Sequence, residues 1–483
     1  MNMISKESII NFFSDQFGAE RVLTDRQSLL QPEGVLVRHF EKAFGYVPKF
    51  LPVCIVKLRS TEEVSVGLKF CNDNGVSVIV QTGATSSEDQ LVLVNDHTVV
   101  LDLIEMDKLI KFDTENMMAT CECGMHLADL ERIANEHGLT TGHCPQSQPV
   151  ACMGGLVATR SIGQFSTYYG GIEDLLCGLE AVMPDGRVLR IRNVPRRSAG
   201  PDLRHLFMGS EGSFAAITEV TVKLFRYYPD DFWKGAFIVD SFERGIDAIR
   251  EILVSGFKPS VVRLYDKPDF DRNYGSAHLD EGQAVMFFVV EGPPDITRVS
   301  GDNINKIAAK FDAVPLGEKV VDHWLATRND CCNTLGSEQT REEYRQTRVF
   351  YTTCEISASW TDIKEIYADV MKNVPEKIDN LVMLGGHVSH SYQNGTNIYF
   401  VYELKAKDPL TMIEVDDWNV VNAITTEVLK YPTGGMCHHH GVGKVRTRKM
   451  REEHGSSYFL IEDLKELFDP NGIMNPGCLL AQD

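Results

Sequence analysis

The segment VCIVKLRSTEEVSVGLKFCNDNGVSVIVQTGA, residues 53–84, sets the pattern of the first half of the chain. Its two apolar runs are typical of strands, and the stretch between them predicts a helix that begins at Ser60 or Thr61. The second strand leads into QTGATSS, residues 81–87. Small side chains there let backbone N–H groups point at an anion, as phosphate-binding loops do. An ordinary polar turn has the same composition and, for this stretch alone, is the simpler interpretation.

Strands and helices alternate along the rest of the chain, and the pattern restarts after residue 227. The strongest hairpin signal is Asp185-Gly186 between two apolar runs. Antiparallel features mixed with helices predict an α+β fold. The predicted units are a helical N-terminal segment at 1–45, a first domain at 46–226, a second at 227–435 and a C-terminal segment at 436–483 that docks on one of them. The predicted elements are strands at 97–103, 117–125, 215–225, 233–239, 260–266 and 284–292, and helices at 126–138, 242–256, 296–311 and 457–468.

Length and charge exclude several classes of protein. A chain of 483 residues exceeds the usual size of a single hydrophobic core, so at least two domains are expected. The 68 acidic and 48 basic side chains give a net charge of −20 at pH 7, which disfavours binding to nucleic acid or anionic membranes. There is neither a signal-peptide pattern nor an apolar run of about 18 residues, so we expect a cytoplasmic protein without a membrane span. The twelve cysteines are expected to be reduced thiols.

Two further segments are rich in small residues. PQSQPVACMGGLVATRSIG, residues 145–163, contains the pair Gly154-Gly155, and residues 209–224 run from a glycine turn into a strand. The first allows a flat cofactor to approach the backbone, although it could equally be a tight helix start. Neither the G-x-G-x-x-G dinucleotide pattern nor the G-x-x-x-x-G-K-[ST] phosphate loop is present, so both of those sites are rejected.

Histidines are concentrated near the end of the chain. Five of the fourteen lie between residues 387 and 440, including the run His438, His439 and His440. Imidazole exchanges protons near neutral pH, so the cluster predicts acid–base chemistry. In a competing hypothesis His387, His390 and one of the three consecutive histidines bind a metal ion. The sequence offers no clear carboxylate partner for such an ion, and no metal is expected.

Arg263 lies within SVVRLYD, residues 260–266, where its guanidinium leaves a rigid strand. A fixed planar guanidinium is suited to a carboxylate or phosphate ligand. An ion pair with Asp266 is the alternative, and the sequence does not decide between them.

Taken together, the ordered motifs resemble those of the FAD-binding PCMH flavoproteins, the vanillyl-alcohol-oxidase superfamily. Within it, the chain is most similar to the branch of alkyldihydroxyacetonephosphate synthases and bacterial FAD-linked oxidoreductases. The resemblance implies a PCMH-type FAD-binding domain of two α+β subdomains at 46–226, an α+β cap with an antiparallel sheet at 227–435, and a C-terminal segment that returns to the FAD domain. The motifs are TGHCPQS at 141–147, GGLVATRS at 154–161, YGGIEDL at 169–175, the stretch at 195–224, RLYD at 263–266, IYF at 398–400 and HHHGVGK at 438–444.

The resemblance also assigns residues to roles. Only Gly83 remains where the family has a glycine run, and no histidine occupies the loop usually used for covalent attachment, so noncovalent FAD is expected. The predicted cofactor residues are Thr82, Gly83, Ala84, Thr85, Ser86, Ser87, Pro145, Ser147, Gly154, Gly155, Thr159, Arg160, Glu211, Gly212 and Ile217. The predicted catalytic residues are Tyr399, His438, His439, His440, His387, His390 and Arg263.

Two enzymatic functions follow from the resemblance. In the first, a small anionic hydroxylated substrate such as a 2-hydroxy acid or sugar acid docks at Arg263, a histidine takes its hydroxyl proton, and hydride passes to flavin N5. The second is alkyldihydroxyacetonephosphate synthesis without net redox. A flavin-binding sensor is disfavoured because it needs no clustered acid–base residues. The electron acceptor stays open among an electron-transfer flavoprotein, a quinone pool and dioxygen, and a homodimer is compatible with the sequence.

Overall fold

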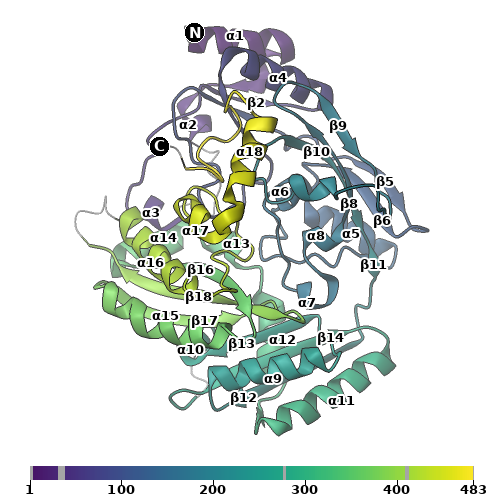
Figure 1. Ribbon diagram of the computed structural model, residues 1–483, viewed down its shortest axis with the longest axis vertical. Coiled ribbons are helices and arrows are strands. Elements are labelled where there is room, and N and C mark those ends of the chain that lie inside the picture. Colours follow the sequence, from purple (N-terminus) through teal and green to yellow (C-terminus); the bar gives the residue numbers. More distant parts are fainter. Residues whose placement is uncertain (1–3, 31–38, 276–278, 408–412, 482–483) are drawn as a thin grey trace.

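Residues 53–84 supply two strands, β2 and β3, of a mainly parallel four-stranded sheet with the order β1-β2-β4-β3, in which β3 is an edge strand. The computed structural model describes residues 4–30, 39–275, 279–407 and 413–481 (Figure 1). Helix α4 begins where the sequence predicts, because the Ser60 side chain accepts a hydrogen bond from the backbone of Glu63, and it ends at Gly75 in a left-handed conformation. The elements are β1 Val22–Leu23, β2 Cys54–Lys57, α4 Thr61–Asn74, β3 Ser77–Gln81 and β4 Thr98–Asp102.

A second, antiparallel sheet completes this half of the molecule, in the order β5-β6-β10-β8-β9. The predicted hairpin is confirmed as β8 and β9, with Gly186 at a φ of 86° in the turn. The edge strand β5 was not predicted, because none of its side chains is fully buried and its sequence shows little apolar alternation. The elements are β5 Leu109–Asp113, β6 Met118–Glu122, α5 Leu127–Glu136, α6 Met153–Ala158, β8 Leu176–Val182, β9 Val188–Ile191 and β10 Ala216–Lys223.

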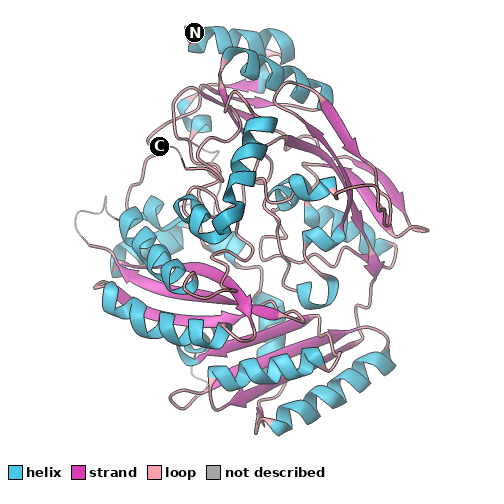
Figure 2. Ribbon diagram, viewed as in Figure 1, coloured by secondary structure: helices cyan, strands magenta, loops and turns pink. Residues whose placement is uncertain are grey.

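The other half is built on a seven-stranded antiparallel sheet, in the order β15-β12-β14-β13-β17-β18-β16. Strand and helix alternate along the chain as the sequence predicts after residue 227, and helices line the sheet in Figure 2. The strands are β12 Phe232–Val239, β13 Val261–Asp266, β14 Ala284–Glu291, β15 Val314–Pro315, β16 Val349–Ser359, β17 Leu381–Val388 and β18 Gly395–Lys405. The helices are α9 Phe242–Val254, α10 Lys267–Tyr274, α11 Pro294–Lys310, α12 Lys319–Thr327, α13 Cys331–Thr334, α14 Glu338–Thr347, α15 Ile363–Lys377 and α16 Ile413–Val428.

The two faces of this sheet serve different purposes. Buried side chains of α9, α11, α15 and α16 pack on one face and form the largest core. The other face contacts α12 and is turned toward the first half of the molecule. Alternation along β13 sends Val262 and Leu264 into the large core and leaves Arg263 and Tyr265 on the opposite face.

The C-terminal segment lies between the two halves (Figure 1). Its last part pairs with the edge of the four-stranded sheet, where the Val78 backbone N–H donates to Ile473 and the Val78 carbonyl accepts from Asn475. The remaining elements are α1 Lys6–Phe17, α2 Arg26–Leu29, α3 His39–Ala43, β7 Leu139–Thr140, α7 Ser166–Tyr169, α8 Ile172–Leu175, β11 Phe225–Arg226, α17 Met450–His454 and α18 Tyr458–Phe468, with short 3₁₀ turns between them.

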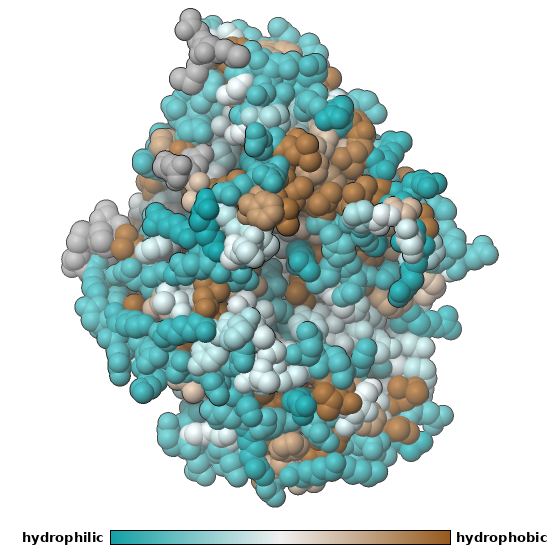
Figure 3. All heavy atoms as spheres, in the orientation of Figure 1, coloured by the Kyte–Doolittle hydropathy of each residue, from teal (hydrophilic) through white to brown (hydrophobic). Residues whose placement is uncertain are grey.

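Antiparallel sheets and helices in two halves agree with the expected α+β fold. The face of the molecule in Figure 3 is largely hydrophilic, in keeping with the net charge of −20. Among the described residues, no helix combines the length and the apolar character required to cross a bilayer.

Candidate active site

A cavity of about 770 Å³ lies between the two halves and is lined by both of them and by the C-terminal segment. It gathers nearly all of the residues that the sequence singles out. Two predicted residues do not line it. The Arg160 side chain is 56% exposed and lies 3.8 Å from Glu173, and the His438 ring contacts Tyr392 and His439. The predicted residues that line the cavity are Thr82, Gly83, Ala84, Thr85, Ser86, Ser87, Pro145, Ser147, Gly154, Gly155, Thr159, Glu211, Gly212, Ile217, Arg263, His387, His390, Tyr399, His439 and His440.

The loop at 82–87 forms one wall of the cavity, and its backbone is held close to a neighbouring segment. A Cβ atom on Gly83 would lie 2.5 Å from the Val150 carbonyl oxygen, so only glycine fits there. Ala84 has a φ of 49°, which is the region that glycine would occupy more easily. Within the described residues, no acceptor pairs with the backbone N–H groups at 84–87, and the buried Ser86 hydroxyl has no partner. This donor set is suited to an anionic group.

The other predicted cofactor residues divide into two kinds. Gly154 must be a glycine because its Cβ would lie 2.5 Å from the Cβ of Cys123, so α6 packs directly against β6. Glu211 lines the cavity, but its carboxylate accepts hydrogen bonds from the backbones of Val442 and Gly443. Burial raises the pKa of Glu211 to about 7, and those two hydrogen bonds oppose the shift. Its side chain therefore anchors the C-terminal segment.

The turn that carries the three histidines is wrapped around the carboxylate of Glu355, on β16. One oxygen, Oε1, accepts the backbone N–H groups of His438, His439 and His440 at 3.2, 3.2 and 2.9 Å. The other, Oε2, lies 2.5 Å from the Arg446 guanidinium and 3.1 Å from Nδ1 of His440. Glu355 and Arg446 are both fully buried. A single internal anion thus shapes the turn.

Glu88 completes a cluster of four charges. Its carboxylate lies 3.4 Å from both His440 and Arg446, so two carboxylates face two cations. Burial alone would lower the pKa of the His440 ring, but Glu355 and Glu88 outweigh it and raise the pKa to about 9. Burial also disfavours charge on Glu355, yet Arg446 and His440 hold its pKa well below the usual range. His440 is therefore an imidazolium at neutral pH.

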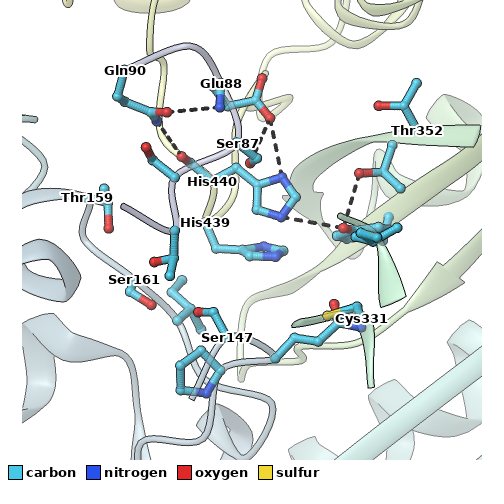
Figure 4. A pocket seen from close by; sticks show the side chains of 18 of the residues that line it. Ser87, Glu88, Gln90, Ser147, Thr159, Ser161, Cys331, Thr352, His439 and His440 are labelled. Carbon is cyan, nitrogen blue, oxygen red and sulfur yellow. Dashed lines mark hydrogen bonds and ion pairs between the residues drawn. The ribbon is translucent and has the colours of Figure 1, made fainter. Parts of the chain in front are cut away.

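The neighbouring rings have the opposite character. Burial lowers the pKa of His438 to about 4, and burial together with nearby histidines lowers the pKa values of His439 and His390 further. His438 and His439 share a 2.9 Å contact between their Nδ1 atoms, and the Tyr392 hydroxyl lies 3.0 Å from the far nitrogen of His438. Figure 4 shows the His439 and His440 rings side by side in the cavity, with Glu88 next to His440.

Strand register places a row of functional groups across four strands. Tyr265 lies opposite His387, His387 lies opposite Tyr399, and Tyr399 lies opposite Glu355. The Tyr399 oxygen accepts a hydrogen bond from Thr353 at 3.1 Å and lies 3.4 Å from Nε2 of His440. Because a protonated His440 can only donate, the tyrosine oxygen accepts twice and its own hydrogen is free to point into the cavity.

Arg263 is buried, with 4% of its surface exposed. Within the described residues no carboxylate lies within 4 Å of its guanidinium, Nε has no hydrogen-bond partner, and the group stacks on Trp324 at 4.8 Å. The alternative ion pair with Asp266 is wrong, because Asp266 instead accepts from Tyr367 and from the Gly386 backbone. A buried cation facing a cavity favours an anionic ligand.

The metal hypothesis grouped His387 with His390 and one of the three consecutive histidines. The structure brings the ring nitrogens of His390, His438 and His439 within 4.8 Å of one another, whereas His387 points to Asp269. The hypothesis therefore named the wrong set of nitrogens.

Sequence reasoning missed four residues that organise the site: Glu88, Asp269, Glu355 and Arg446. One signal was available for Glu355, since a single carboxylate in the otherwise uncharged strand 349–359 predicts a buried partner for it. The other three side chains meet their partners only through tertiary folding, and nothing in their local sequence indicates this.

Two family models match the chain. The FAD binding domain matches residues 52–192, and the C-terminal domain of FAD linked oxidases matches residues 235–479. The chain is 43% identical over 481 residues, 99% of both proteins, to the uncharacterised FAD-linked oxidoreductase YgcU of Escherichia coli strain K12.

The names of the more distant relatives describe different enzymes. The chain is 26% identical to mitochondrial D-lactate dehydrogenase [cytochrome] 1 of Saccharomyces cerevisiae, across 90% of this chain and 74% of that protein. A solved structure of alkyldihydroxyacetonephosphate synthase superimposes with a TM-score of 0.79 at 22% identity, over 98% of this chain and 85% of that one. At that identity, the likeness to the synthase structure extends to the fold alone.

Proposed function

Because this chain belongs to the FAD-linked oxidoreductases, we propose that it is a dehydrogenase that oxidises a small anionic hydroxylated substrate, such as a 2-hydroxy acid or sugar acid. The observation that carries the proposal is the buried guanidinium of Arg263, for which the described residues supply no carboxylate partner and which faces the same cavity as Tyr399 and the histidines. A carboxylate or phosphate bound at Arg263 would neutralise the guanidinium and hold the substrate beside the proton-exchanging groups.

The residues present fit FAD. The N–H groups at 84–87 and the Ser86 hydroxyl offer donors to its diphosphate, and Gly83 and Gly155 keep the backbone close. When bound, FAD accepts the hydride that leaves the substrate carbon. The loop at 82–87 carries neither histidine nor cysteine, so noncovalent attachment is proposed. Denaturing the yellow protein with acid should release its colour into the supernatant, whereas colour retained in the precipitate would contradict this.

The chain's own groups divide the remaining work. The Tyr399 hydroxyl, polarised by the His440 imidazolium, donates to the substrate oxygen, and a neutral histidine accepts the hydroxyl proton. The positive charge of His440 also favours negative charge that develops next to it. A soluble redox acceptor such as an electron-transfer flavoprotein is proposed to take the electrons.

The experiment is anaerobic addition of a panel of 2-hydroxy acids and sugar acids to the purified holoprotein. Bleaching of the flavin absorbance by at least one compound is expected. If none of the panel bleaches the flavin, the dehydrogenase proposal fails.

Ether-lipid synthesis is the competing function, and one observation favours it. Part of the cavity lining is apolar, formed by Phe40, Val415, Trp418, Val421 and Val445, which is the kind of surface that a hydrocarbon chain contacts. Incubation with acyl-dihydroxyacetone phosphate and a long-chain alcohol distinguishes the two functions, because an ether product without flavin bleaching would identify the synthase.

A further inference from the structure

Asp269 and His387 form a buried pair at the edge of the cavity. The Asp269 carboxylate lies 2.5 Å from Nδ1 of His387, with 0% of its side chain exposed against 12% for the histidine. A carboxylate can only accept, so Nδ1 must donate. This leaves the lone pair of a neutral ring on Nε2, for which the described residues supply no hydrogen-bond partner, in a side chain that lines the cavity.

The pair is held rigidly on both sides. The Asn273 side chain donates to the second oxygen of Asp269 at 2.7 Å. The His387 ring stacks between Tyr265 and Tyr399, with centroids 4.8 Å from each. A Cβ atom on Gly385 would lie 2.9 Å from the Asp269 backbone nitrogen, so the glycine lets β17 approach α10 closely. The direction of Nε2 is therefore fixed before any ligand binds.

The other cavity histidines are less suited to accept a proton. His440 is already charged. One nitrogen of His390 lies 2.8 Å from the Ser166 hydroxyl, and its ring packs against His438 and His439. Burial and, after it, the charge of the adjacent His440 ring lower the pKa of His439. Burial also lowers the pKa of His387, but there the Asp269 carboxylate opposes the shift. His387 alone among the five has a carboxylate on one nitrogen and a free second nitrogen.

We propose that His387 is the general base of the dehydrogenation and that Asp269 is the residue that positions it; this assignment rests on the proposed function. The substrate hydroxyl proton moves to Nε2 of His387 while the substrate C–H bond breaks and its hydride passes to FAD, which leaves a carbonyl product. His387 then returns its proton to solvent. Asp269 fixes the reactive tautomer and stabilises the imidazolium that forms, as the aspartate of a catalytic triad does.

The first test needs no substrate. Holoprotein labelled with ¹⁵N in its histidine rings reports the tautomer by NMR, and the His387 signal is identified by its loss in His387→Gln. We expect the proton on Nδ1 in the unmodified protein and a shift toward Nε2 in Asp269→Asn. Asp271→Asn is the matched control, because Asp271 lies on the same helix and pairs with Lys267. A proton on Nε2 in the unmodified protein would overturn the assignment.

The second test measures the rate of anaerobic flavin reduction by the reactive panel compound as a function of pH. Asp269→Asn should slow reduction by about 10²- to 10⁴-fold and change the pH profile, with substrate affinity within about threefold. Asp269→Glu should restore part of the rate, and Asp271→Asn should keep the original profile. Equal losses in both asparagine variants would reduce Asp269 to a structural role. If no compound reduces the flavin, both the proposed function and the catalytic role of His387 are rejected. The NMR spectra of the histidine rings still show whether Asp269 sets the tautomer of His387.

Discussion

Nδ1 of His440 lies 3.1 Å from the carboxylate of Glu355, whose other oxygen accepts the backbone N–H groups of three consecutive histidines. The same side chain therefore shapes the turn and keeps its last ring charged, while the two preceding rings stay neutral. A run of three identical residues in this way supplies two protonation states within one turn.

Replacing Glu355 with glutamine should be strongly destabilising. The change leaves Arg446, which is fully buried, with only the more distant Glu88 carboxylate. Breaking a buried ion pair costs about 3–5 kcal/mol, so urea denaturation should show a loss of that order. Lys377→Gln is a suitable control, because its partner Glu427 keeps a second lysine, Lys430. A Glu355→Gln variant as stable as this control would contradict the role of the cluster.

The stability of the protein should fall in alkali. The pKa of His440 is raised to about 9 from an unfolded value near 6.5, so its contribution is fully present below about pH 6.5 and disappears as the pH rises through 9. The expected loss is on the order of 3 kcal/mol. The buried neutral His438, with a pKa of about 4, acts in the opposite sense and costs stability as the pH falls below about 6.5. Denaturation midpoints from pH 5 to 9.5 should therefore pass through a maximum.

A His440→Asn variant should lose the alkaline part of this dependence, whereas His205→Asn, at a half-exposed position, should keep it. Equal alkaline slopes in both variants would assign the loss to other groups.

Gly83→Ala should weaken FAD binding. The added methyl group meets the Val150 carbonyl oxygen at 2.5 Å and forces the loop at 82–87 away from that segment. We expect at least a tenfold weaker affinity in titrations of flavin fluorescence, equivalent to about 1.4 kcal/mol. Gly67→Ala adds the same methyl group within α4, where the nearest atom is 3.4 Å away, and should bind FAD normally. Unchanged affinity in Gly83→Ala would argue against this loop as the diphosphate site.

Arg263→Met should raise stability and lower substrate affinity together. The buried guanidinium finds no carboxylate within 4 Å among the described residues, and an uncompensated buried charge is costly. We expect a higher melting temperature and a concentration for half-maximal flavin reduction raised about 10- to 100-fold. Arg187→Met, at an exposed position, should change neither quantity. If Arg263→Met lowers the melting temperature, the arginine stabilises the fold through its own contacts, which would contradict this prediction.

Tyr399→Phe should keep bound FAD but slow flavin reduction by about 10²- to 10³-fold, because it removes the donor next to His440. The stopped-flow absorbance change measures this rate. Tyr402→Phe, on the opposite face of the same strand, loses a hydrogen bond to Asp417 and should cost stability without a comparable rate loss. Turnover unchanged in Tyr399→Phe would reject its role.

Local patterns predicted much of the fold. The helix after Ser60 and the Asp185-Gly186 hairpin depend on contacts between residues close in sequence, and both lie where predicted. Nearly all of the residues that the resemblance named line the cavity. Glu355 and His440, by contrast, are 85 positions apart, and their contact forms only when the C-terminal segment packs against the large sheet. Arg160 was predicted to bind the cofactor because it belongs to a motif, and most of the other residues of that motif line the cavity. Its φ is 53°, and its side chain is 56% exposed.

The charge cluster also limits how far the molecule can be divided. Glu88 follows the loop at 82–87, and Glu355 lies on the seven-stranded sheet. Their two positively charged partners, His440 and Arg446, both belong to the C-terminal segment. A fragment that stops before residue 436 would bury two carboxylates with no cation, so neither half is a self-sufficient module. A truncated or domain-exchanged variant of this chain must therefore keep the C-terminal segment together with both Glu88 and Glu355.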